Sequence, residues 1–201
     1  MMTPNVVDEV VSAVRAYPAV NGVELVGSRA NGSAGPLSDW DFKLETSDPE
    51  RVFTELPAVV ESFGPLAAFW DPLGERRNYM PIFRGLTKLD LHLDMEPLPA
   101  RPWAVGRVTL PALDDHFWDW TLWLAGKAMK GKDDLVLHEL EKMRTYLLGP
   151  LGVDATPTNL RDAIDVYSAA RDQAEDDCHV YVGGRELERE VRSALAEHAL
   201  V

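Results

Sequence analysis

The spacing of apolar residues changes partway along the chain, and the change predicts two regions of different structure. In residues 5–17 apolar positions recur every three or four residues, as in an amphipathic helix, and Pro18 ends the run. Two short segments that follow, one from residue 23 ending in Gly27 and one over 39–44, are predicted as strands, the second because apolar and polar residues alternate along it. A second helix is predicted over 49–63.

Three extended runs come next and complete a region of mixed helix and sheet. They cover residues 65–71, 77–85 and 87–95, with turn residues between them. Gly85 lies in the tight connection between the last two runs, which therefore predict a hairpin. The first domain is accordingly expected over residues 1–98, as a mixed sheet flanked by helices.

A proline-rich segment, 96–111, leads to a region whose pattern is almost wholly helical. Apolar residues recur there every three or four positions, and Gly131 interrupts the pattern as a helix stop. The helices are predicted over residues 114–130, 133–148, 158–175 and 184–200. The predicted fold class is therefore α+β, with a C-terminal helical bundle at 112–201 as the second domain.

Composition narrows the class of protein. The chain has 201 residues, of which 46% are hydrophobic, so it can bury a core of ordinary size. No apolar run approaches the ~18 residues of a membrane span, and Asp8 and Glu9 stand where a signal peptide carries basic residues. We therefore expect a cytoplasmic protein with no membrane partner. The single cysteine, Cys178, excludes an intramolecular disulfide and fits a reducing compartment.

The charge of the chain restricts its partners. The formal net charge is −13, which repels polyanions and argues against a nucleic-acid partner. The same charge favours a cationic partner. A homodimer is left open by the sequence.

Candidate chemistry begins in the segment "GSRANGSAGPLSDWDFKL", residues 27–44. Asp39 and Asp41 are two positions apart on a predicted strand, so their side chains point the same way, about 6–7 Å apart along the backbone. Such a pair is often only a solvated face. However, Mg²⁺ takes carboxylate oxygens together with substrate phosphate oxygens, so the pair is also a candidate metal clamp for a nucleoside triphosphate.

Gly27 and Ser28 form a candidate phosphate site before this pair. A glycine lets the backbone approach a phosphate closely, and the Ser28 hydroxyl can bind one together with free N–H groups at a turn. Arg29 lies beside them and is a candidate phosphate contact, with a salt bridge as the competing interpretation. Ser38 is a candidate for holding the start of the second strand through a hydrogen bond to the backbone.

The order of these features resembles the signature of the DNA polymerase β-like nucleotidyltransferase superfamily. There a Gly-Ser pair is followed, about a dozen residues on, by two aspartates that flank an apolar residue on a strand. "GSRANGSAGPLSDWDF" looks like the version found in small bacterial aminoglycoside and lincosamide nucleotidyltransferases and in minimal nucleotidyltransferases of toxin–antitoxin systems. The resemblance covers residues 20–95 and implies the nucleotidyltransferase fold for the first domain.

The resemblance also implies a third carboxylate on a neighbouring strand. Asp90, enclosed as Leu-Asp-Leu on the polar face of the run 87–95, is the candidate, and Asp94 is the alternative. In the family such a residue completes the metal site or acts as general base on the acceptor hydroxyl. His92 shares this polar face and is interpreted as structural or merely near the site.

In the helical domain the resemblance implies a basic residue that faces the triphosphate, before a turn of the Arg-Gly-Asp kind. Here residues 130–133 read Lys-Gly-Lys-Asp, so the match is loose. Lys127 is the candidate for cofactor binding, because its spacing from Trp123 places it on the inner side of the predicted helix. Lys130 is the alternative, and a lysine stem lying along the helix surface is the ordinary interpretation of either.

The implied reaction is in-line attack by an acceptor hydroxyl on the α-phosphorus of a Mg²⁺-bound triphosphate, with pyrophosphate leaving. The resemblance gives two Mg²⁺ ions, held by Asp39, Asp41 and Asp90, and ATP as the default co-substrate. The expected acceptor is a small molecule of the aminoglycoside or lincosamide type, and the acidic charge suits a cationic one. Two alternatives stay open. One is a regulatory or antitoxin-type protein that acts on or binds a partner protein or a transfer RNA, and the other is a non-catalytic binding module, which the intact carboxylates argue against.

Overall fold

The structure is a computed structural model that describes residues 5–183 and 185–200 of the chain. The chain divides into two compact units, Met1–Ala100 and Arg101–Val201, and the division falls inside the proline-rich segment 96–111. The fold class is α+β, because a mixed sheet with helices is followed by a unit made of helices. None of the described helices is both long and apolar enough to cross a membrane.

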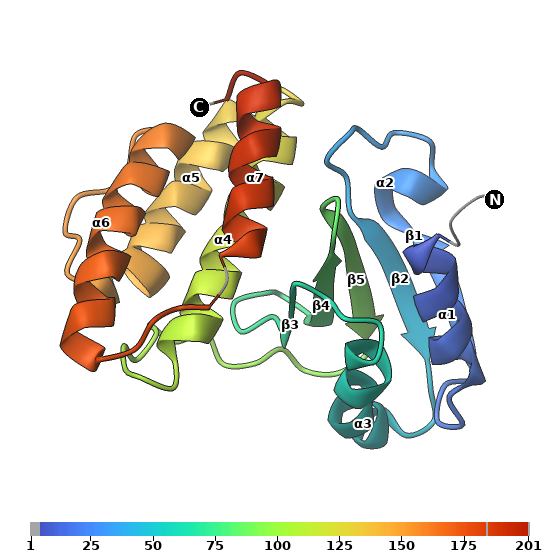
Figure 1. Ribbon diagram of the computed structural model, residues 1–201. Helices are drawn as coiled ribbons and strands as arrows, with labels where there is room; N and C mark the ends of the chain where they lie inside the picture. The colour runs from blue at the N-terminus through green and yellow to red at the C-terminus, as the bar shows by residue number, and fades with distance from the viewer. Residues whose placement is uncertain (1–4, 184, 201) are drawn as a thin grey trace. The chain divides into compact units, whose positions relative to one another are not determined.

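The first unit is built on a single five-stranded sheet (Figure 1). Its strands are β1 (Gly22–Val26), β2 (Trp40–Glu45), β3 (Ala67–Trp70), β4 (Arg77–Phe83) and β5 (Thr87–Leu93). They lie in the order β1-β2-β5-β4-β3. The pair β2–β5 is parallel and the other neighbouring pairs are antiparallel, so the sheet is mixed and brings together two strands that lie far apart in the sequence.

Two helices of the first unit, α1 (Val6–Ala16) and α3 (Pro49–Glu61), cover one face of the sheet. Asn5 and Asp48 cap their N-termini, each accepting a hydrogen bond from a backbone N–H of the first turn. The apolar sides of the helices pack on the strands in one core that includes Val7, Val10, Val14, Phe42, Leu44, Val52, Leu56, Val60, Leu89, Leu91 and Leu93. Because side chains alternate along a strand, the polar residues of β2 and β5 lie on the opposite face.

A short helix replaces the end of the first predicted strand. The sequence predicted a strand that ends in Gly27, whereas β1 ends at Val26 and Gly27 begins α2 (Gly27–Ala30). Gly27 has a φ of +69°, a conformation that glycine adopts without steric cost. The chain therefore changes direction at Gly27, and residues 31–39 form the loop that leads into β2.

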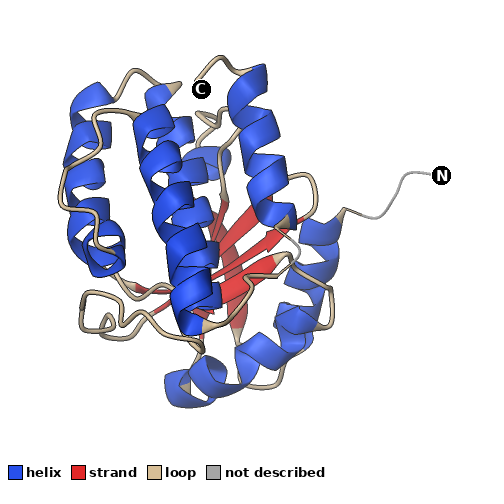
Figure 2. Ribbon diagram, turned by 60° about the vertical axis from the view of Figure 1, so that its left-hand side comes forward, coloured by secondary structure: helices blue, strands red, loops and turns tan. Residues whose placement is uncertain are grey.

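The second unit is a helical bundle (Figure 2). Its helix α4 contacts the three other long helices. These helices are α4 (Leu110–Ala128), α5 (Asp133–Met143), α6 (Leu160–Cys178) and α7 (Glu186–Glu197). The helix predicted from residue 114 begins earlier, at Leu110. Pro111 lies in its first turn, where a missing N–H costs no hydrogen bond.

The helix predicted over 133–148 changes its winding before it ends. α5 is regular to Met143 and continues as a π-helical turn over Arg144–Leu148. Pro150 has no N–H to donate to the carbonyl of Tyr146, and that carbonyl accepts a hydrogen bond from the backbone N of Trp103 instead, at 3.0 Å. The wider turn therefore coincides with the point where the regular hydrogen-bond ladder cannot continue.

Buried charges tie three helices of the second unit together. Oδ1 of Asp114 on α4 accepts hydrogen bonds from the Tyr167 hydroxyl at 2.6 Å, from Trp118 Nε1 at 3.2 Å and from Arg171 Nη1 at 3.2 Å. Arg171 also donates to Glu188 on α7 at 2.6 Å. Burial raises the pKa of Asp114, and the hydrogen bonds from Tyr167 and the charge of Arg171 oppose that rise. The guanidinium of Arg171 thus supplies the positive charge that balances Asp114 and Glu188 inside the bundle.

Candidate metal centre

Three carboxylates of the first unit meet on the polar face of its sheet. Asp39 precedes β2 directly, Asp41 lies within β2, and Asp90 lies within β5. Asp41 is directly opposite Asp90 in the parallel pairing, so their side chains leave the sheet on the same side. One oxygen from each of the three carboxylates lies within 4.8 Å of the other two. We call Asp39, Asp41 and Asp90 the aspartate triad.

The donor atoms of the aspartate triad suit a hard divalent cation. Carboxylate oxygens are preferred ligands of Mg²⁺, which also keeps positions for water and substrate phosphate. Asp90 is buried, with 8% of its surface exposed, whereas Asp39 and Asp41 are half-buried. Within the described residues, no hydrogen bond or ion pair is made to the carboxylate of Asp39. The donor set and spacing of the triad therefore fit a Mg²⁺ ion.

Gly27 lies directly against Asp41. Val26, the residue before it, is opposite Asp41 in the antiparallel pairing of β1 with β2. A Cβ atom at Gly27 would come within 2.1 Å of Asp41 Oδ2, and the φ of +69° also disfavours a side chain there. The close approach of the backbone to the carboxylate thus requires glycine at this position. Ser28 follows in α2, and its carbonyl accepts a hydrogen bond from Ser33 N at 2.9 Å.

Arg29 binds the loop before β2. Its guanidinium donates to the carbonyl oxygens of Ser38 at 2.5 Å and Asp39 at 2.9 Å, and it lies 4.2 Å from the ring centroid of Trp40. Ser38 Oγ accepts a hydrogen bond from Gly35 N at 2.9 Å, which closes the same loop. Arg29 and Ser38 therefore both fix the backbone that presents Asp39. The phosphate contact considered for Arg29 stays a prediction beside these hydrogen bonds to carbonyl oxygens.

Two basic side chains of β5 flank the triad. Lys88 Nζ lies 3.6 Å from an Asp90 oxygen, and His92 Nε2 lies 3.4 Å from Asp41 Oδ1. Sequence reasoning gave His92 no functional role, although strand alternation already placed it on the same face as Asp90. Its proximity to Asp41 depends on the register of β5 against β2, which no local pattern reveals. Asp94, the alternative third carboxylate, is exposed beyond the end of β5 and is not part of the triad.

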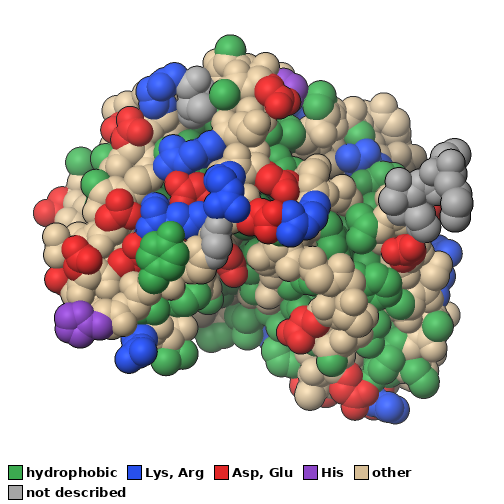
Figure 3. Space-filling model, viewed as in Figure 1, with side chains coloured by type: hydrophobic (Ala, Val, Ile, Leu, Met, Phe, Trp, Pro, Cys, Tyr) green, Lys and Arg blue, Asp and Glu red, His purple; other side chains and the backbone are tan. Residues whose placement is uncertain are grey.

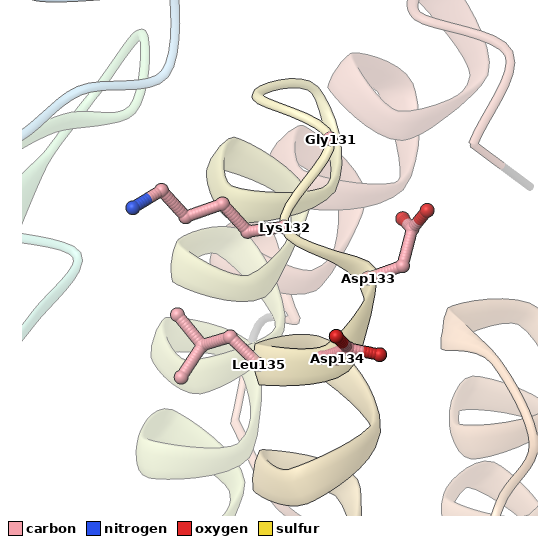
Figure 4. A pocket seen from close by; sticks show the side chains of 5 residues that line it. All are labelled: Gly131, Lys132, Asp133, Asp134 and Leu135. Atoms are coloured by element: carbon pink, nitrogen blue, oxygen red, sulfur yellow. The ribbon is translucent and has the colours of Figure 1, made fainter.

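Lys127, the candidate triphosphate contact of the helical domain, lies on α4 of the second unit. Its ammonium is 4.5 Å from the centroid of the Trp123 ring, a cation–π contact within one helix face. Lys130 lies in the turn that follows α4. A pocket of about 390 Å³ is lined there by the five consecutive residues 131–135. In Figure 4 the side chain of Lys132 points away from those of Asp133 and Asp134, so these groups do not converge on a common ligand.

The visible surface of the second unit carries mixed charge. On the face drawn in Figure 3, its Lys and Arg side chains lie among Asp and Glu side chains.

No protein-family model matches this chain, and no curated protein matches it. Its function is therefore inferred from the aspartate triad and from the segment that surrounds it.

Proposed function

We propose that this protein is a Mg²⁺-dependent nucleotidyltransferase. It would transfer a nucleoside monophosphate, AMP from ATP by default, to a hydroxyl group of a small molecule. The observation that carries this proposal is the aspartate triad, three carboxylates within 4.8 Å of one another beside Gly27. Carboxylates this close repel one another and are stabilised by a cation, which a Mg²⁺-bound triphosphate supplies.

The residues of the triad have two proposed roles. Asp39 and Asp41 would hold the metal, and the resemblance to nucleotidyltransferases implies two ions. Asp90, which is buried and opposite Asp41, is either a further ligand or the base that takes the proton of the acceptor hydroxyl. Bound Mg²⁺ supplies neutralisation of the triphosphate charge and orients the phosphates for in-line attack. The sheet holds the carboxylates rigidly, as catalysis by positioning requires.

The segment around Gly27 is proposed to bind the leaving phosphates. Gly27 and Ser28 would present backbone N–H groups and a hydroxyl to them. Arg29 is assigned to the loop that carries Asp39, because both of its described hydrogen bonds go to that loop. Lys127 stays the candidate cation of the second unit for the triphosphate.

A cationic acceptor of the aminoglycoside type fits the charge of the sheet's polar face. Besides the triad, this face carries Glu24 and Glu45 in the register of β1 with β2, and Asp94 follows β5; all three are exposed. Lys43 opposite Glu24 and Lys88 beside Asp90 offset part of this negative charge, so the carboxylates remain in excess. Their field would attract a polycation, whereas a lincosamide would depend more on apolar contacts. The net charge of −13 acts in the same direction.

Transfer of label from ATP tests the proposal. The protein is incubated with Mg²⁺, a panel of aminoglycosides and lincosamides, and ATP labelled at either the α- or the γ-phosphorus. Nucleotidyl transfer places only the α-label on the acceptor, because the γ-label leaves with pyrophosphate. D39N is the matched loss-of-function variant, since it removes a ligand without changing shape, and D94N is the control outside the triad.

The proposal predicts an α-labelled drug with wild-type protein and D94N, and none with D39N or with chelator. Transfer of the γ-label would identify a phosphotransferase instead. An equal yield from D39N would contradict the assignment of the triad. α-Label on protein or RNA from a cell lysate, with no drug labelled, would replace the small-molecule acceptor by a macromolecule.

A further inference from the structure

Three polar side chains, one from each of three neighbouring strands, form a continuous line across the sheet to the aspartate triad. Asn78 lies on β4, His92 on β5 and Asp41 on β2. Asn78 is directly opposite His92, so both side chains leave the sheet on the same face. His92 is opposite Lys43 in the parallel pairing, two residues along β2 from Asp41. The imidazole therefore reaches Asp41 diagonally.

Both ring nitrogens of His92 have a partner in this line. Nδ1 lies 2.6 Å from Oδ1 of Asn78. A neutral imidazole carries one N–H, so an Nε2–H that donates toward Asp41 leaves Nδ1 as an acceptor, and the Asn78 amide donates to it after a half-turn that exchanges its oxygen and nitrogen. Nε2 lies 3.4 Å from Oδ1 of Asp41. The His92 and Asp41 side chains are only 17% and 19% exposed, so solvent screens their contact less than it would at the surface. The ring is thus held by β4 at one end and faces a metal-ligand candidate at the other.

The carboxylate of Asp41 is confined on both sides. Its Oδ1 faces His92, and its Oδ2 lies where a side chain at Gly27 would clash, 2.1 Å from the Cβ position. The side chain of Asp41 therefore lies between the imidazole of His92 and the backbone of Gly27. Groups that orient a metal ligand in this way raise the affinity of the site even though they do not touch the ion.

We propose that His92 and Asn78 are positioning residues of the metal site. His92 fixes the orientation of the Asp41 carboxylate, and Asn78 acts on Asp41 only through His92. The inference rests on the metal site of the proposed function, but it concerns residues to which that function assigns no part.

Mn²⁺ binding to the full chain, measured by isothermal titration calorimetry without nucleotide or acceptor, tests this inference. H92L is expected to weaken Mn²⁺ binding by about 10- to 100-fold, the usual cost of losing a group that orients a ligand. N78L is expected to weaken binding in the same direction but less. The double variant H92L/N78L is expected to bind no more weakly than H92L, because Asn78 has no route to Asp41 once the imidazole is gone.

Two amide substitutions distinguish the role of Nε2 of His92 from that of Nδ1. The amide nitrogen of Gln can take the place of Nε2 beside Asp41, whereas that of Asn can take only the place of Nδ1 beside Asn78. H92Q is therefore expected to bind Mn²⁺ more tightly than H92N, and H92N is expected to resemble H92L. A histidine that only packs would give no such order. Should H92L fail to fold, as judged by urea unfolding without ion, H92Q and H92N carry the test.

The Mn²⁺ measurements distinguish failure of this inference from failure of the proposed metal site. If wild-type protein binds Mn²⁺ and H92L and H92N bind it equally well, this inference is wrong and the metal site stands. Additive losses in H92L and N78L would show that Asn78 does not act through His92, which also overturns the inference. If the wild-type protein binds no Mn²⁺, the metal site and this inference fail together.

Discussion

Each unit of the protein gathers acidic side chains in or near its interior, but the two groups are neutralised differently. In the second unit Asp114 and Glu188 are both within hydrogen-bond distance of Arg171, at 3.2 and 2.6 Å. In the first unit the basic neighbours of the aspartate triad stand farther off, Lys88 at 3.6 Å from Asp90 and His92 at 3.4 Å from Asp41.

The difference separates a structural ion pair from a ligand site. Arg171 is always charged and supplies several donors in fixed geometry, so it satisfies its two carboxylates permanently. Among the described residues, no hydrogen bond or ion pair reaches the carboxylate of Asp39. A divalent cation is the partner that the three clustered carboxylates suit best. The comparison predicts opposite responses to mutation in the two units, and the free energy of unfolding measures both.

The largest effect is expected for R171M. Removing the guanidinium leaves Asp114 and Glu188 buried without their cation, which costs about 3–5 kcal/mol of the free energy of unfolding. Urea denaturation gives that value, and R161M at an exposed position of α6 is the control. The triple variant D114N/R171M/E188Q should recover part of the loss. A loss from R171M no greater than from R161M would contradict a structural role for this ion pair.

A smaller loss is expected for G27A in the first unit. The methyl group must displace Asp41, and alanine at positive φ is strained, so the free energy of unfolding should fall by about 1–3 kcal/mol. G32A is the matched control, because Gly32 has a φ of +76° but nothing within 4 Å of its Cβ position. Mn²⁺ binding should fall in G27A alone. Equal Mn²⁺ binding by both variants would show that the Gly27 contact does not orient Asp41.

The second unit should also lose stability as pH rises. Burial, with a smaller contribution from the charge of Asp114, raises the pKa of Asp115 to about 7. The folded state therefore binds the Asp115 proton more tightly than the unfolded chain does. Protonated Asp115 thus adds to the free energy of unfolding in acid, and this stabilisation is lost as pH rises toward 7. D115N should remove a decline on the order of 2 kcal/mol in the free energy of unfolding between pH 5 and 8. D165N at an exposed position is the control, and its free energy of unfolding should fall with pH as steeply as that of the wild-type protein.

The smallest effect is expected for D41N without divalent ions. The substitution removes like-charge repulsion within the triad, so the free energy of unfolding should change by less than about 1 kcal/mol or rise. D114N in the second unit should lose more, because it abolishes an ion pair with Arg171. Saturating Mn²⁺ should then stabilise the wild-type protein but not D41N. A large loss from D41N in the absence of ion would mean that the triad is a structural element.

The sequence predicts which face of the sheet a side chain lies on better than it predicts which strands pair with one another. Alternation in 39–44 and 87–95 correctly places Phe42, Leu89 and Leu91 in the core, because the two-residue period of a strand is fixed by its backbone. The pairing of β2 with β5 is a long-range contact that local pattern does not contain. The opposition of Asp41 to Asp90 and the diagonal contact of His92 both follow from that pairing.

Other features escaped prediction because they depend on distant parts of the chain. The hydrogen bonds of Arg29 to the carbonyl oxygens of Ser38 and Asp39 depend on the path of the loop, which no local pattern contains. The π-helical turn at residues 144–148 occurs where the Tyr146 carbonyl accepts a hydrogen bond from Trp103, which lies in a distant segment.

Anomalous diffraction from crystals grown with Mn²⁺ and a non-hydrolysable ATP analogue tests the central claim most directly. The account predicts a Mn²⁺ peak at about 2.2 Å from carboxylate oxygens of Asp39 and Asp41, with phosphate oxygens of the analogue completing the coordination. An analogue bound elsewhere, or a triad with no metal peak at saturating Mn²⁺, would contradict it.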